Sequence, residues 1–369
     1  MDFNVERNTF LEGIQKTLGI VERKTTIPIL NNVLIKTDNN QIRIIATDRE
    51  IGLISDYKAD IVIPGEITVS ARKLFEMVRE IQGDVINIKK MDNNWVNITC
   101  AKIDYRIPGI ATDDFPEVPD NQDVSLSTIP CSILKEMIHK TFFAISNDEM
   151  KVSLTGVFFH MEKGLIEMVA TDGHRLSIAK TQYKGEMLSN IDIDGIIIPR
   201  KGVSEIRKLV DDETGDVQLG VTKGVCIVKK GSTLLRVSLL DAEYPDYHKV
   251  IPEGEGIRVQ VDRDMILHSL KRMSVISSER FSGVKIKVAN NKIVLSSTNP
   301  DVGEANDEID ISYSGKECEM GYNVKYLIDA IDVIAEDSIL IEMREAYGPG
   351  VVMSSGSDKY ICVIMPLRL

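Results

Sequence analysis

Residues 168–172 read MVATD, an apolar run that ends in a threonine and an aspartate. Two other stretches have the same form: residues 44–48 read IIATD and residues 295–299 read LSSTN. Each pattern indicates an apolar strand that runs into a polar turn. Their threonines, Thr47, Thr171 and Thr298, are spaced by 124 and 127 residues. The chain is therefore predicted to contain three similar segments of roughly 120 residues each.

The neighbourhood of each threonine repeats as well. An amphipathic helix precedes it, with Leu11, Leu134 and Leu267 as the aligned positions, and a second amphipathic helix follows it. Each segment closes on an aromatic residue or a methionine that precedes a proline. The six helices are predicted over residues 6–21, 70–81, 131–145, 199–211, 262–276 and 322–335.

Between the helices, alternating strands are joined by short polar turns, which favours antiparallel hairpins. The predicted fold class is α+β, with three repeated domains that each cover one face of an antiparallel sheet with two helices. The domain boundaries are predicted at residues 1–122, 123–253 and 254–369, because polar and Pro/Gly-rich stretches lie there.

Composition narrows the function. The formal net charge is −12, which by itself argues against nucleic acid as a partner unless positive charge is gathered on one face. The first residues lack the basic start and apolar core of a signal peptide, so a cytoplasmic protein is expected. The five cysteines form no CxxC pair and are expected to be reduced, buried thiols. No nucleotide-binding or metal-binding motif is present, and no cofactor is expected.

Residues 170–177 read ATDGHRLS and place an aspartate, a histidine and a serine close together. A nucleophilic serine needs a sharp, exposed turn, whereas Ser177 lies where the apolar pattern resumes as a strand. The first and third segments lack the histidine, so the Thr-Asp pair is expected to be structural, with the aspartate capping its own turn. The chain is predicted not to be an enzyme. The alternative is a hydrolase that uses Asp172 and His174 with a distant serine.

Three features together resemble a known family: ATDGHRLS, the EYPDY stretch at 243–247 and the ending VIMPLRL. The chain resembles the beta subunits of bacterial DNA polymerase III, the sliding clamps. The resemblance implies the DNA clamp fold and a ring-shaped homodimer that surrounds duplex DNA without sequence specificity. It also implies a peptide groove for the replicative polymerase, the clamp loader and other clamp-motif proteins. A repeat-built scaffold that does not encircle DNA remains the other alternative.

Charge supports a DNA-facing lining. The six predicted helices hold 15 Lys and Arg against 11 Asp and Glu, in a chain whose total charge is negative. Such a lining would contact phosphates, which carry no sequence information. Most candidates follow from placement on a helix, and one in a loop follows from the resemblance. The predicted DNA-facing residues are Lys24, Arg72, Arg79, Arg200, Lys201, Arg207, Lys271 and Arg272.

The groove and the dimer seam follow from the resemblance. His248 and Lys249 stand where the family often has arginines. The groove is expected to include Leu154, Thr171, Gly173, His174, Arg175, Leu176, Pro245, Val250, Asn323, Tyr326, Val363, Met365, Pro366 and Arg368. The apolar chain end should be a docked final strand, with Met365 onward leaving the sheet to wall the groove. The dimer interface is expected to include Lys73, Met77, Tyr105, Ile107, Val275 and Ile276.

Overall fold

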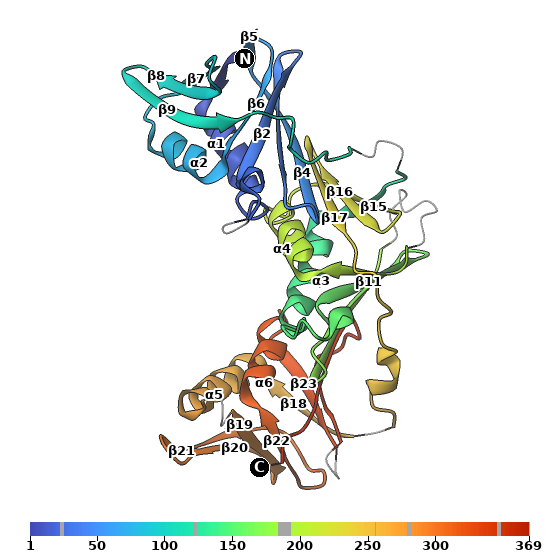
Figure 1. The fold of residues 1–369 in the computed structure, drawn as a ribbon. Coiled ribbons are helices and arrows are strands. Elements are labelled where there is room, and N and C mark those ends of the chain that lie inside the picture. The colour runs from blue at the N-terminus through green and yellow to red at the C-terminus, as the bar shows by residue number, and fades with distance from the viewer. Residues whose placement is uncertain are drawn as a thin grey trace. The chain divides into compact units, whose positions relative to one another are not determined.

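The computed structural model describes residues 1–22, 26–120, 124–183, 193–254, 256–278, 282–344 and 348–368. These residues belong to two compact units, whose elements are drawn in Figure 1. The first unit comprises Met1–Cys131 and Ser204–Leu239, and the second comprises Ser132–Val203 and Leu240–Leu369. The candidate Lys24 lies outside the described residues.

One order of strands and helices occurs three times along the chain. The first repeat consists of β1 (Asp2–Glu6), α1 (Arg7–Thr17), β2 (Asn32–Asp38), β3 (Gln41–Thr47), β4 (Ile51–Lys58), β5 (Asp60–Ile63), β6 (Glu66–Ser70), α2 (Ala71–Glu80), β7 (Val85–Lys90), β8 (Trp95–Cys100) and β9 (Ile103–Ile110). The second consists of β10 (Ser127–Pro130), α3 (Cys131–Thr141), β11 (Gly156–Glu162), β12 (Leu165–Thr171), β13 (Arg175–Gln182), β14 (Ile193–Pro199), α4 (Arg200–Leu209), β15 (Asp216–Thr222), β16 (Val225–Lys230) and β17 (Thr233–Ser238). The third consists of β18 (Ile257–Asp262), α5 (Arg263–Ile276), β19 (Gly283–Ala289), β20 (Lys292–Asn299), β21 (Gly303–Asp310), β22 (Cys318–Asn323), α6 (Val324–Asp332), β23 (Ser338–Met343), β24 (Gly350–Ser354) and β25 (Tyr360–Ile364).

Apart from β5, each repeat is itself two copies of a strand, a helix and three strands. The first strand of each copy pairs with the strand that follows the helix of the other copy, as β6 does with β2 and β1 with β7. The same pairing joins β14 to β11 and β10 to β15, and β22 to β19 and β18 to β23. Every pair is antiparallel, which confirms the predicted α+β class.

The sheets also continue from one repeat into the next, which the sequence did not predict. In the first unit, β4 pairs with β17, and in the second unit, β13 pairs with β25. These contacts are called the β4–β17 junction and the β13–β25 junction below. The described strands consequently form sheets of 13, 8 and 4 strands, instead of one sheet for each repeat.

All six predicted helices are present, with somewhat shorter bounds. In the first and third repeats, the two helices contact each other and the strands beneath them. Each helix begins directly after a strand, so positions can be compared by counting from its first residue. Counted this way, Leu134 is equivalent to Phe10 and Ile266, both fully buried. The predicted alignment with Leu11 and Leu267 was therefore wrong by one residue.

The cysteines are as expected. All five are buried and none forms a disulfide. Within the described ranges, no helix is long and apolar enough to cross a membrane.

Candidate functional site

The candidate site lies in the second unit and is organised by the turn between β12 and β13. The Thr171 hydroxyl donates to the Arg175 carbonyl oxygen at 2.6 Å and accepts from the Gly173 N–H at 3.1 Å. The Asp172 carboxylate accepts from the N–H groups of His174 and Arg175 at 2.9 and 3.0 Å. Gly173 has φ of 90°, a conformation that glycine adopts without strain. The prediction that the aspartate caps its own turn is confirmed.

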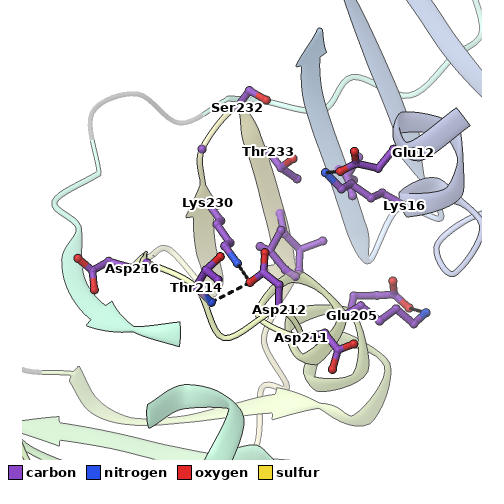
Figure 2. A pocket seen from close by; sticks show the side chains of 16 residues that line it. Glu12, Lys16, Glu205, Asp211, Asp212, Thr214, Asp216, Lys230, Ser232 and Thr233 are labelled. Atoms are coloured by element: carbon purple, nitrogen blue, oxygen red, sulfur yellow. Dashed lines mark hydrogen bonds and ion pairs between the residues drawn. The ribbon is translucent and has the colours of Figure 1, made fainter. Parts of the chain in front are cut away.

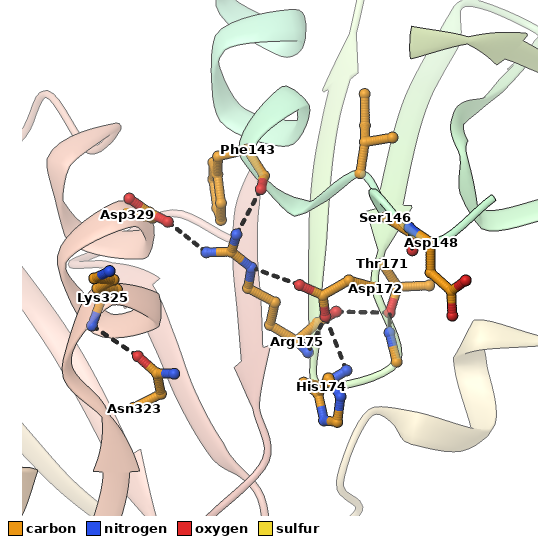
Figure 3. A network of polar contacts seen from close by, with 12 residues as sticks. Phe143, Ser146, Asp148, Thr171, Asp172, His174, Arg175, Asn323, Lys325 and Asp329 are labelled. Atoms are coloured by element: carbon orange, nitrogen blue, oxygen red, sulfur yellow. Dashed lines mark hydrogen bonds and ion pairs between the residues drawn. The ribbon is translucent and has the colours of Figure 1, made fainter. Parts of the chain in front are cut away.

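Arg175 connects this turn to two other elements, as Figure 3 shows. Its Nε donates to Asp172 at 3.1 Å, its Nη1 to Asp329 of α6 at 2.6 Å and its Nη2 to the Phe143 carbonyl oxygen at 2.6 Å. The guanidinium also lies 4.4 Å from the ring centre of Tyr326. Only 10% of the side chain is exposed. Arg175 thus positions the turn, and three of its N–H donors are used inside the chain.

An apolar cluster lies beside the turn. Leu176 of β13 and Val363 of β25 are direct cross-strand partners, and both are buried. Around this pair pack residues from β11, β12, β13, β25 and the segment after β17. The other members are Val169, Ile178, Tyr247, Phe158, Tyr244, Ile251 and Ile361. Burial raises the pKa of the Tyr244 hydroxyl far above its ordinary value, so this ring stays neutral within the cluster.

The chain end borders the same turn. After β25, the Met365 N–H donates to the His174 carbonyl oxygen at 2.9 Å. The Leu367 N–H donates to the Gly321 carbonyl oxygen at 2.8 Å, which forms an isolated bridge. The apolar end is therefore docked, and its backbone leads from the turn toward β22. Met365 remains 43% exposed.

All fourteen predicted groove residues are described, and all belong to the second unit. They differ in burial. The exposed residues are Gly173, His174, Pro245, Val250, Met365 and Arg368. The residues of intermediate exposure are Leu154, Thr171, Arg175, Asn323, Tyr326 and Pro366. The buried residues are Leu176 and Val363. Asn323 accepts from the Lys325 N–H and caps α6. The structure brings together the turn, the Leu176–Val363 pair and the Arg175–Tyr326 contact.

Sequence reasoning missed three residues that hold this site: Phe143, Tyr247 and Asp329. Asp329 is distant from Arg175 in sequence, and no local pattern links them. Tyr247 belongs to the quoted EYPDY stretch, so its aromatic character was a usable signal.

The structure does not assemble a hydrolytic site at the turn. The Ser177 side chain is fully buried, and its hydroxyl donates to the Lys140 carbonyl oxygen. His174 is exposed, while its backbone groups bond to Asp172 and Met365. The serine and histidine therefore face different surroundings.

The predicted DNA-facing residues divide between the two units. Arg72, Arg79 and Arg207 belong to the first unit, and Arg200, Lys201, Lys271 and Arg272 belong to the second. Those on exposed faces are Arg79, Arg207, Lys271 and Arg272. Arg200 differs, because its Nη2 donates to the Ile145 carbonyl oxygen at 2.9 Å and its guanidinium lies 5.1 Å from the Phe142 ring centre. Burial lowers the pKa of Arg200. Its own chain holds this side chain, and the Arg272 Nε is likewise held by Asp307 at 2.8 Å.

The predicted seam residues are also in both units. Val275 is 76% exposed, and Lys73 is exposed beside Glu76, with 2.8 Å between Nζ and Oε2. Met77, Tyr105 and Ile276 are half-buried. Ile107 is only 4% exposed. Its side chain is covered by its own unit, and its place in the interface stays a prediction.

Three models of known domain families match successive parts of the chain. Residues 1–119 match the N-terminal domain of the DNA polymerase III beta subunit, residues 128–246 its central domain and residues 248–368 its C-terminal domain. Among curated proteins, the beta sliding clamp of Caulobacter vibrioides is 30% identical and that of Pseudomonas aeruginosa 28% identical, each over the full length of both chains. The DNA polymerase sliding clamp of Bacillus subtilis superimposes with a TM-score of 0.95 at 26% identity, covering 100% of this chain and 99% of that one. Sequence repeat, fold and similarity agree, and the chain belongs to the family of DNA polymerase III beta subunits, the beta sliding clamps.

Proposed function

We propose that two copies of this chain form a ring that encircles duplex DNA and tethers the replicative polymerase, the clamp loader and other partners through the groove at the β13–β25 junction. The observation that carries the proposal is a pair of open strand edges. β21 lies at the edge of its sheet. Residues 103–108 of β9 pair with β8 on one side, and only Gly109 and Ile110 also pair with β6. Open edges of this kind invite pairing with another chain.

The internal repeat identifies the partner of each edge. Three strands follow the first helix of each repeat. At both junctions, the third of these strands pairs with the final strand of the next repeat: β4 pairs with β17, and β13 pairs with β25. In the third repeat that strand is β21. Of the three final strands in the part of the chain that the structure describes, β17 and β25 are already paired in this way, and β9 remains. Pairing β21 of each copy with β9 of the other gives two equivalent seams and a closed ring.

The same rule sets the register of the seam. Equivalent pairs at the two junctions are Val237 with Ile51, and Ile364 with Arg175. Carried to the open edges, they give Ile107 opposite Gly303, Arg106 opposite Glu304 and Tyr105 opposite Ala305. Arg106 and Glu304 are both exposed and have opposite charges. A cross-strand pair of opposite charge favours this register.

The expected seam residues also have counterparts that already pack together. Counted along their elements, Lys73, Met77, Tyr105, Ile107, Val275 and Ile276 correspond to Tyr326, Ala330, Cys362, Ile364, Phe143 and Ala144. The first five counterparts belong to one apolar cluster at the β13–β25 junction, and Ala144 is fully buried. Val275, exposed in one copy, occupies the position of the packed Phe143. A second copy would cover it.

The remaining parts of the proposal follow from chemistry. Arg79, Arg207, Lys271 and Arg272 are exposed, and phosphates would compete with Glu80, Asp332 and Asp307 for three of them, without any base-reading contact. The groove offers the exposed apolar groups of Val250 and Met365 beside a rigid turn, which suits a short peptide with apolar anchors. Each copy would contribute domains over residues 1–122, 123–253 and 254–369 and act in the cytoplasm.

The test is a cysteine cross-link across the seam, followed by a topological assay. The variant Tyr105→Cys, Ala305→Cys should form both intermolecular disulfides, because directly opposed strand residues have Cβ atoms within disulfide reach. The native cysteines are all buried and should not interfere. When the variant is oxidised in the presence of a relaxed plasmid circle, the cross-linked ring should stay on the DNA through a high-salt wash. It should dissociate from the DNA after the circle is linearised.

The matched control is Tyr105→Cys, Asp307→Cys, which shifts the second cysteine by two positions and should cross-link poorly. Equal cross-linking of both variants would reject the register. Retention that does not depend on circularity would reject encirclement.

A further inference from the structure

A cavity of about 400 Å³ lies in the first unit at the β4–β17 junction. Its lining includes Thr47, Arg49 and Gly52 from the turn between β3 and β4, Pro116 and Val118 from the segment after β9, and Arg236 of β17. Pro116 follows Phe115 as Pro245 follows Tyr244 beside the groove. The cavity thus occupies, one repeat earlier, the place of the candidate groove.

The hydrogen bonds that the Thr and Asp side chains make to backbone groups match in the two turns. The Thr47 hydroxyl donates to the Ile51 carbonyl oxygen at 2.8 Å and accepts from the Arg49 N–H at 2.9 Å. The Asp48 carboxylate accepts from the N–H groups of Glu50 and Ile51 at 3.0 and 2.6 Å. The Ser238 N–H donates to the Glu50 carbonyl oxygen at 2.8 Å, as Met365 does to His174.

The apolar floors match as well. Beneath the cavity, Leu34, Ile45 and Ile54 form a buried cluster with Phe115, Val118 and Leu234. Their counterparts at the groove, in the same order, are Phe158, Val169, Ile178, Tyr244, Tyr247 and Ile361, all members of the groove cluster. The shared frame therefore includes backbone and floor.

Two wall positions differ in a way that changes the ligand. The Leu176–Val363 pair of the groove is replaced by Gly52 opposite Arg236. A Cβ on Gly52 would lie 2.5 Å from a methyl of Val118, so glycine is needed for this packing. Arg236 brings a guanidinium whose Nε is buried and has no hydrogen-bond partner among the described residues. A buried cationic donor without an acceptor is a costly arrangement, which an anionic oxygen in the cavity would relieve once the Arg236 side chain turns to expose this N–H.

Arg49 adds a second cation at a position where the backbone favours glycine. Its φ is 81°, while its counterpart in the groove turn is Gly173 with φ of 90°. A non-glycine residue in this region is strained, and such strain often marks a functional position. The side chain of Arg49 is exposed, as are the carboxylates of Asp114 and Glu117, which line the same cavity. Water can therefore solvate the carboxylates of Asp114 and Glu117. The Arg236 Nε is buried away from water and has no such solvation.

We infer that this cavity is a second peptide site, which binds an extended segment through a carboxylate on Arg236 with apolar neighbours against Pro116 and Val118. The inference draws on the proposed peptide groove for its template, but the recognised group is different. The groove offers aliphatic walls, whereas this site would select an aspartate, a glutamate or a terminal carboxylate. A partner with an apolar anchor and an acidic segment could then contact the chain at two places.

The probes are acetyl-Leu-Asp-Leu-amide and its neutral analogue acetyl-Leu-Asn-Leu-amide. Each is titrated into the full chain labelled with ¹⁵N at backbone and arginine Nε, and the signals of Arg236 and Gly52 are followed. The aspartyl peptide should shift both signals, and the asparaginyl peptide should bind about tenfold more weakly or worse, because it lacks the charge-assisted hydrogen bond. Arg236→Gln should remove the difference between the peptides.

The matched control is Arg43→Gln, since that guanidinium on β3 is already held by Asp56 at 2.7 Å. It should leave the titration unchanged. Equal binding of the two peptides to the native chain, or no shift of Arg236 and Gly52 at millimolar peptide, would overturn the inference. The Gly173 amide reports the groove in the same spectra. The Gly173 signal therefore tests the groove, and the Arg236 and Gly52 signals test this site, so that failure of one assignment is distinguished from failure of the other.

Discussion

The β4–β17 and β13–β25 junctions have the same backbone and different interiors. Both have a Thr-Asp turn with the same hydrogen bonds, and both extend one repeat's sheet into the next. At the β13–β25 junction, Tyr360 is fully buried and donates its hydroxyl to the Ala330 carbonyl oxygen at 2.9 Å. Its counterpart at the β4–β17 junction is Thr233, because Tyr360 pairs with Ala179 and Thr233 pairs with Ser55, and these two pairs are equivalent.

Smaller side chains leave space at the β4–β17 junction. A cavity of about 680 Å³ opens beside Thr233, and Figure 2 shows it bordered by Lys16, Glu205 and the Lys230–Asp212 pair. Gly19 occupies the position of Phe143, with the Glu205 and Lys208 side chains against it, and Ile51 occupies that of Arg175. One repeated frame therefore yields a tightly filled junction and a hollow one. Filling is decided by a few side chains and not by the backbone.

The largest expected effect comes from emptying the filled junction. Tyr360→Thr gives the β13–β25 junction the residue of its counterpart and should lower the free energy of unfolding by about 3–5 kcal/mol, the usual cost of truncating a buried aromatic side chain. Denaturant titration followed by circular dichroism measures it. Tyr360→Phe is the matched control and should cost only about 1 kcal/mol for the lost hydrogen bond. If Tyr360→Thr were as stable as Tyr360→Phe, the filling would not stabilise the junction.

Arg175→Ile gives the polar network of the β13–β25 junction the residue that its counterpart has, Ile51. It leaves Asp172, Asp329 and the Phe143 carbonyl without their shared donor. The expected loss is about 2–4 kcal/mol, below the full cost of breaking a buried ion pair because Asp329 is 40% exposed. Arg175→Lys should recover little, since one ammonium cannot reproduce the fork of donors. Thermal unfolding decides the matter, and a lysine variant as stable as the native chain would show that charge alone suffices.

The β13–β25 junction should also respond to alkali through Cys362. Burial raises the pKa of the Cys362 thiol to about 12, and Leu235 occupies the equivalent position at the β4–β17 junction. Between about pH 9 and 12, the unfolded thiol ionises while the folded one stays protonated, so stability falls as the pH rises. The expected loss from this group is about 2–3 kcal/mol by about pH 11. Unfolding titrations at several pH values measure it. Cys362→Val should remove this group's share of the slope and leave the share of Cys226, whose thiol pKa burial also raises to about 12. An unchanged slope would assign the dependence to other groups.

Much of the fold followed from sequence because its signals are local. The helices were placed by apolar spacing, and the turn around Asp172 by its residue types. Membership of the sliding-clamp family, rather than any missing motif, confirms that the chain is not an enzyme.

What could not be predicted depends on distant residues. Arg175 meets Asp329 across 154 positions of sequence, and the strand pairings between repeats join edges that no local pattern connects. The Leu11 alignment slipped because two adjacent apolar residues occupy the helix, and only packing shows that Phe10 is the buried one.

The smallest expected effect concerns the turn that both junctions share. Arg49 and Gly173 occupy equivalent positions, with φ of 81° and 90°. Arg49→Gly should relieve backbone strain and raise the free energy of unfolding by up to about 1 kcal/mol, although it deletes a side chain. Gly173→Arg should lower it by a similar amount. Asn39, which also has positive φ but belongs to a residue type that tolerates it, gives the control Asn39→Gly, with a smaller gain. If Arg49→Gly instead destabilised the chain, its side chain would be making contacts that outweigh the strain, and the account of this position as one kept for binding would fail.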